Sequence, residues 1–196
     1  MIDIKRFQRT IENFDQVNQA DPIREIHNEQ SYPRALLYAQ RMTTQLARFV
    51  PNASESLKLA ARAQHIKRWH IPRSNYPLGR EGYKKWRAEL AIYHADIAGS
   101  IMLEAGYDDT AISRVAQLLQ KKQLKRDAET QALEDVICLV FIEHYLPAFM
   151  TKHSPEKLID IIRKTWKKMS PEGHKTALTL TLPENISSLI EKALKQ

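Results

Sequence analysis

Apolar residues recur every three or four positions along most of the chain, which is the spacing that places them on one face of an α-helix. Phe7, Ile11 and Phe14 make one such stripe, and the segment from Pro33 to Phe49 makes another. Only five glycines occur in 196 residues, whereas helix-favouring alanine, leucine, glutamine and lysine are abundant. We therefore predict an all-α fold, a helical bundle in which residues 1–196 form a single domain.

Capping residues and helix breakers divide this pattern into separate helices. A serine or aspartate before a helix accepts hydrogen bonds from its free N–H groups, and proline suits the first helical position. Helix starts and ends are expected near Pro22, Pro33, Pro51, Ser54, Trp69, Glu81, Gly106, Asp108, Ala128, Tyr145, Ser154 and Ser170. The best candidate strand is the isolated segment ALTLTLP at 177–183.

Composition limits the class of protein. With 43% hydrophobic and 27% charged residues, the chain is typical of soluble globular proteins, and no run approaches the ~20 apolar residues that span a bilayer. Its single cysteine, Cys138, excludes a disulfide framework and a cysteine-rich zinc motif. The first residues, MIDIKRFQRT, lack the apolar core of a signal peptide, so we expect a cytoplasmic protein that does not associate with membranes.

Positive charge is concentrated between Lys58 and Leu90. This segment holds nine basic and two acidic residues, an excess of seven that equals the net charge of +7 of the whole chain. A local field of one sign attracts anions such as a phosphate, a nucleotide or an RNA backbone. A solvated helix face is the alternative explanation. If the segment binds an anion, the expected substrate-binding residues are Arg68, Arg73, Arg80 and Arg87, with Trp69 and Trp86 stacking on a base or instead packing in the core.

Two histidines fall on apolar stripes. His65 follows Leu57 and Ala61 at intervals of four, and His94 follows Leu90 in the same way, so both are expected to point into the bundle. A buried imidazole needs partners for its ring nitrogens, and these are commonly a carbonyl, a carboxylate or a metal ion. The pattern leaves open whether the histidines are metal ligands or hydrogen-bonded core residues.

Two neighbouring acidic residues lie near the start of the most apolar helix predicted from the sequence. Glu134 and Asp135 in QALEDVICLVFIEH precede a segment that is apolar all round, which is typical of a deeply buried helix. Buried carboxylates are costly unless they are paired or coordinate a metal ion. They therefore form ion pairs with arginines of the basic segment, or they belong to a metal site.

Six segments of the chain resemble the family of domain of unknown function 4202 proteins, and together they extend over nearly the whole length. They are DP at 21–22, AARAQHIKRWHIPRSNYP at 60–77, GYKKWRAEL at 82–90, HAD at 94–96, LEDVICLVF at 133–141 and RKTWKKMS at 163–170. This resemblance implies no particular activity.

The chain is also distantly similar to the HD superfamily of helical, metal-dependent phosphohydrolases. Their ligands are a histidine, a His-Asp doublet and a later aspartate on separate helices. The similarity implies that His65, His94 and Asp135 bind a divalent metal ion as cofactor, in a site within residues 57–145. Ala95 stands where the aspartate of the doublet belongs, which disfavours a two-metal site.

Two functions of different classes follow from these observations. The first is a metal-dependent phosphohydrolase acting on a nucleotide or small phosphorylated metabolite, with Glu134 as general base. The second is a non-catalytic module that binds a nucleotide or RNA through residues 58–90, with the histidines hydrogen-bonded in the core. A scaffold for a protein partner ranks third because it leaves the local basicity unexplained.

Overall fold

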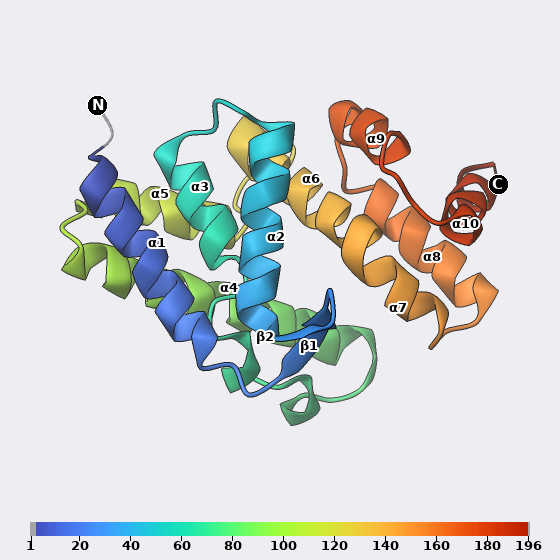
Figure 1. Cartoon of the computed structure of the whole chain (residues 1–196), viewed down its shortest axis with the longest axis horizontal. Coiled ribbons are helices and arrows are strands. Elements are labelled where there is room, and N and C mark those ends of the chain that lie inside the picture. The colour runs from blue at the N-terminus through green and yellow to red at the C-terminus, as the bar shows by residue number, and fades with distance from the viewer. Residues whose placement is uncertain (1–2, 196) are drawn as a thin grey trace. The chain divides into compact units, whose positions relative to one another are not determined.

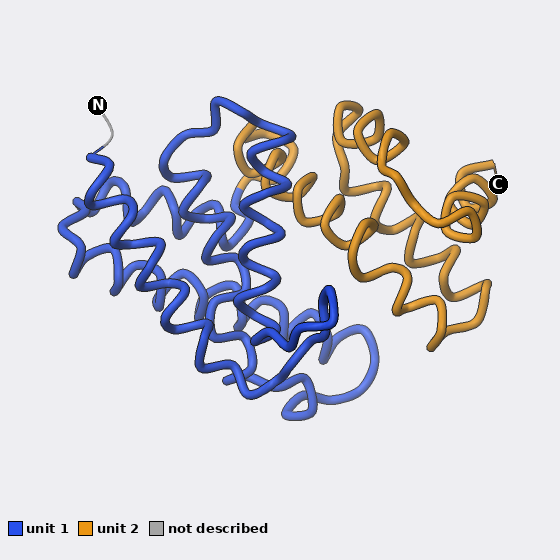
Figure 2. The backbone as a smooth tube through the Cα atoms, in the orientation of Figure 1, with its two compact units in different colours: residues 1–122 blue, residues 123–196 orange. Residues whose placement is uncertain are grey.

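The computed structural model describes residues 3–195 and confirms the all-α fold (Figure 1). Within these residues it contains ten α-helices and one small antiparallel sheet of two strands. The chain divides into two compact units, an N-terminal unit of residues 1–122 and a C-terminal unit of residues 123–196 (Figure 2). None of the helices in the described part of the chain is long and apolar enough to cross a membrane.

The N-terminal unit is built from helices α1 to α5 and the hairpin between α1 and α2. Its elements are α1 (Ile4–Gln19), β1 (Arg24–His27), β2 (Gln30–Pro33), α2 (Arg34–Phe49), α3 (Glu55–Ala63), the 3-10 turns η1 (Arg68–His70) and η2 (Arg73–Asn75), α4 (Gly79–Glu104) and α5 (Asp109–Leu119). Helix α3 packs against α1, α2 and α5, and α4 packs along α5. The core between them includes Phe14, Met42, Leu57, Leu90 and Leu118, each at most 1% exposed.

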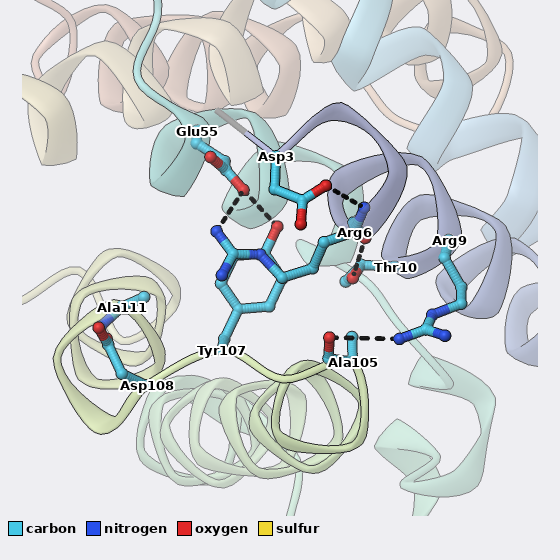
Figure 3. A network of polar contacts seen from close by, with 9 residues as sticks. All are labelled: Asp3, Arg6, Arg9, Thr10, Glu55, Ala105, Tyr107, Asp108 and Ala111. Carbon is cyan, nitrogen blue, oxygen red and sulfur yellow. Dashed lines mark hydrogen bonds and ion pairs between the residues drawn. The ribbon is translucent and has the colours of Figure 1, made fainter. Parts of the chain in front are cut away.

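Polar contacts join three helix ends at one side of this unit (Figure 3). The hydroxyl of Tyr107 donates to the carboxylate of Glu55, and Arg6 lies 3.7 Å from the same carboxylate. The guanidinium of Arg6 also covers the ring of Tyr107 at 4.1 Å. Burial and the neighbouring Glu55 raise the pKa of Tyr107 to about 12. This arginine therefore has both a carboxylate and an aromatic partner, which is typical of a structural role.

The C-terminal unit is a smaller group of helices with its own apolar core. Its elements are α6 (Ala128–Val140), a π-helical turn η3 (Phe141–Tyr145), α7 (Leu146–Met150), α8 (Pro155–Trp166), α9 (Pro171–Leu178) and α10 (Glu184–Leu194). Leu133, Val136 and Leu139 on α6 are fully buried, and α8 packs against α10. As expected, Ser154 and Ser170 cap α8 and α9 through their side chains, with proline in the first turn of each helix.

Local structure differs from what the sequence indicated at three places. The hairpin of β1 and β2 was not foreseen, because its turn at Asn28 and Glu29 has two left-handed residues without glycine. The candidate strand at 177–183 is instead the end of α9 followed by a turn, since an isolated strand has no neighbour to satisfy its backbone. The third helix ends at Ala63 rather than at Trp69; a turn follows, and Lys67 at its end adopts a left-handed conformation with φ of 51° that no helix continues through.

Candidate anion site in the N-terminal unit

The segment after α3 turns sharply and then runs along α4. Lys67, in its left-handed conformation, donates its N–H to the buried Asn18 side chain at 3.1 Å. The indole N–H of Trp86 on α4 donates to the carbonyl of Ile71 at 2.8 Å. Gly82 lies so close to the segment that a β-carbon there would sit 2.0 Å from the carbonyl oxygen of Pro77. These contacts fix the basic segment against the start of α4.

His94 is buried on α4, as its position on the apolar stripe predicts, with 3% of its surface exposed. Its Nδ1 lies 2.7 Å from the carbonyl oxygen of Ile66 and must donate, because a carbonyl only accepts. In the neutral ring Nε2 then carries the lone pair, and this buried atom has no hydrogen-bond partner among the described residues. Burial, and next the charge of Arg68, lower the pKa of His94 to about 3, so the ring is neutral at ordinary pH.

His65 lies beyond the end of α3 and not on its face, yet it approaches His94. Its ring stacks on that of Tyr38 at 3.9 Å and is centred 6.0 Å from the ring of His94. Burial, and then the charges of Arg68 and Arg87, hold the pKa of His65 well below its usual value. The two predicted imidazoles are thus brought together in surroundings of positive charge.

Arg68 is the most unusual charged group of this region. Its guanidinium covers the ring of Trp86 at 4.6 Å, and its buried Nη1 has no hydrogen-bond partner among the described residues. Burial lowers its pKa to about 10, and the nearby charge of Arg87 acts in the same direction. Three further positive side chains lower the pKa of Arg68 or of His65 through their charge. Together with Arg68 we call them the cationic cluster, which consists of Arg34, Arg68, Arg87 and Lys121.

Other arginines of the same unit are matched by acceptors of the protein. Arg62 is buried, and its Nε donates to the carboxylate of Asp15 at 2.7 Å. Arg73 donates to the carbonyls of Tyr76 and Pro77 at 2.8 and 2.7 Å. Arg68 differs because its Nη1 has no acceptor among the described residues and the largest charge effect on its pKa comes from another arginine, Arg87. A buried donor among like charges is the arrangement expected where an anion binds.

The structure separates the six predicted substrate-binding residues by their surroundings. Arg68 and the half-buried Arg87 belong to the cationic cluster, whereas Arg73 holds the loop together and Arg80 is exposed. Trp86 packs under Arg68, and Trp69 is half-buried in η1. The sequence argument missed Arg34, Tyr38 and Lys121, which lie outside the basic segment and are brought to it by the fold. No local sequence signal marks them.

Asp135, the third predicted metal ligand, lies in the C-terminal unit and is 1% exposed. Its carboxylate accepts hydrogen bonds from the N–H and hydroxyl of Ser170 at 2.7 and 2.6 Å, and from Gln131 at 3.2 Å. A β-carbon at Gly173 would lie 2.6 Å from the same carboxylate. Asp135 therefore organises the start of α9. Its neighbour Glu134 is also buried, and the ammonium group of Lys168 lies 3.9 Å from its carboxylate.

The donors present fit a metal ion poorly. Among residues 3–195 no group of three or more histidine, cysteine, aspartate or glutamate side chains is arranged to hold one. The imidazoles of His65 and His94 supply two nitrogen donors, but Arg68 and Arg87 add positive charge beside both rings. Fixed cations repel a metal ion and attract an anion. The local electrostatics thus favour an anion over a cation here.

These features define an all-α protein whose N-terminal unit carries buried imidazoles beside a cationic cluster. The chain belongs to the family described as Domain of unknown function (DUF4202), whose model matches residues 8–190. No curated protein and no solved structure matches it. The resemblance to this family is therefore confirmed, while the similarity to the HD superfamily stays a prediction.

Proposed function

We propose that the N-terminal unit binds a phosphorylated small molecule through the cationic cluster. The observation that carries this proposal is the buried Nη1 of Arg68, a donor without a partner among the described residues. The positive charge of Arg87 acts on the same guanidinium and lowers its pKa. A phosphate group accepts hydrogen bonds from guanidinium groups and offsets the repulsion between them. The tight packing of Arg68 on Trp86 holds the donor in place before the ligand arrives.

Calorimetric titration of the full chain with inorganic phosphate and with ribose 5-phosphate tests this proposal. We expect binding without added metal, weakened roughly tenfold or more by Arg68→Met and by Arg87→Met. The control is Arg9→Met, which removes an exposed arginine of α1 whose side chain donates to the carbonyl of Ala105. Unchanged affinity in Arg68→Met, or an equal loss in Arg9→Met, would refute the proposal.

A metal-dependent phosphohydrolase is the second candidate. It is favoured by the lone pair on Nε2 of His94, which is buried and has no partner among the described residues, with the ring of His65 centred 6.0 Å away. In this candidate the imidazoles of His65 and His94 hold the divalent metal ion, and water and the phosphate oxygen take its open positions. Elemental analysis and phosphatase assays with p-nitrophenyl phosphate distinguish the two. Stoichiometric metal that is lost in His94→Gln, together with turnover that a chelator abolishes, would establish the hydrolase. Phosphate binding that persists after chelation supports the anion site without catalysis.

A further inference from the structure

One face of α4 leads from solvent into the core beside the cationic cluster. Arg80, Tyr83 and Arg87 are spaced by three and four residues, so they share this face, which continues to Leu90 and His94. Exposure falls along it: Arg80 is exposed, Tyr83 is 51% exposed, Arg87 is half-buried, and Leu90 and His94 are 1% and 3% exposed. The face is therefore open at its outer end and closed at its inner end.

Tyr83 is the aromatic side chain that this face leaves open. Its ring is centred 5.8 Å from the ring of Trp86 at an interplanar angle of 54°. Trp86 itself is engaged, because its N–H is bound to the carbonyl of Ile71 and its ring is covered by Arg68. Tyr83 keeps about half of its surface in solvent between two arginines of its own helix face. A half-exposed ring of this kind offers a stacking surface to a planar group.

We infer that the phosphorylated ligand is a mononucleotide, with its base on Tyr83 and its phosphate at Arg68 and Arg87. This inference rests on the proposed function. Tyr83 and Arg87 are about 6 Å apart along the helix axis, since each residue rises about 1.5 Å. A ribose spans such a separation between base and phosphate. Leu90 and His94, which follow Arg87 on this face, are buried, and we therefore place a terminal phosphate there rather than a continuing polynucleotide backbone.

Titration calorimetry with adenosine 5′-monophosphate, ribose 5-phosphate and inorganic phosphate tests the inference on the full chain. We expect the nucleotide to bind roughly tenfold more tightly than ribose 5-phosphate, because it adds one stacked base. Tyr83→Ala removes this advantage and leaves the affinity for the other two ligands unchanged, whereas Tyr83→Phe retains it. Ile92→Ala is the matched control: Ile92 is 52% exposed on the same helix, but nine residues from Tyr83 and so on the opposite face.

The outcomes separate this inference from the proposed function. Equal affinities for the nucleotide and ribose 5-phosphate would overturn the stacked base while leaving the anion site intact. Failure of all three ligands to bind would refute the anion site itself. An oligouridylate without terminal phosphates that binds more tightly than the mononucleotide, with affinity falling steeply in salt, would overturn the choice of ligand in favour of RNA.

Discussion

Asp135 in the C-terminal unit and Arg68 in the N-terminal unit both bury polar atoms, but they differ in whether those atoms have hydrogen-bond partners among the described residues. In the C-terminal unit, Asp135 is completely enclosed and accepts hydrogen bonds from Ser170 and Gln131. In the N-terminal unit, Arg68 and His94 each bury an atom that has no partner among the described residues. A satisfied buried charge stabilises its own unit, whereas an unsatisfied one lowers stability and is available to a ligand. Asp135 therefore has a structural role in its unit, whereas the unsatisfied Nη1 of Arg68 supports the proposed anion site.

The largest effect is expected from Asp135→Ala. Removing this carboxylate leaves the buried donors of Ser170 without an acceptor, so the free energy of unfolding should fall by about 4 kcal/mol. Urea unfolding followed by circular dichroism measures the loss. Glu172→Ala, at an exposed position on α9, is the control and should change stability little. Full stability combined with loss of a bound metal ion would make Asp135 a metal ligand and break the comparison.

Two arginines of the N-terminal unit, Arg62 and Arg68, sharpen the comparison further. Arg62→Met should cost about 3 kcal/mol of unfolding free energy, because it leaves the carboxylate of Asp15 uncompensated. Arg68→Met should stay within about 1 kcal/mol of the parent protein, because it removes a charge whose strongest charged neighbour is another cation. Urea unfolding of both variants checks this difference. Equal losses would mean that Arg68 is held by the protein as firmly as Arg62.

The pH dependence of stability gives the next largest effect. In the unfolded chain His94 titrates near its ordinary pKa of 6.5, but in the folded chain its pKa is about 3. The stability that its neutral form contributes is therefore complete above pH 6.5 and is lost as the pH falls toward 3, because the unfolded state takes up the proton first.

Between pH 6.5 and pH 5 this difference should remove about 2 kcal/mol of unfolding free energy. Urea unfolding at the two pH values measures it, and His94→Gln should reduce the dependence. His65 acts with the same sign, since its pKa is also lowered. His153, which is exposed, supplies the control substitution His153→Gln. An unchanged pH dependence in His94→Gln would show that this ring is not buried in its neutral form.

Two helix caps in the C-terminal unit give the smallest effect. Ser170 caps α9 and donates to the buried Asp135, whereas Ser154 caps α8 and its other side-chain partner is the exposed Glu156. Ser170→Ala should therefore cost about 1.5 kcal/mol, and Ser154→Ala roughly half as much. Thermal unfolding of the two variants measures both losses. Equal losses would show that the bond from Ser170 to Asp135 adds nothing to the cap.

Local patterns in the sequence predicted most of the helices and several of their caps. Apolar spacing placed α2 and the buried His94, and Ser54, Asp108, Ser154 and Ser170 cap the helices as expected. These features depend on residues within one or two turns of each other, so the sequence carries them directly.

The surroundings of the candidate site depend on distant residues and could not be predicted. Asp135 meets Ser170 across 35 positions, and Tyr38 reaches His65 from another helix. The helix-face argument for His65 failed because α3 ends at Ala63, two residues before this histidine, although the ring still approaches His94. Whether an arginine finds a hydrogen-bond acceptor depends on tertiary contacts, which the spacing of residues along the chain does not predict.

The packing of Arg68 on Trp86 makes this indole an intrinsic optical reporter. A ligand that draws the guanidinium toward itself changes the electric field over the ring, so the emission of Trp86 shifts in wavelength when the site fills. Trp166, stacked on His174 in the other unit, supplies a spectroscopic reference in the same molecule. Occupancy can thus be followed by fluorescence without any attached dye.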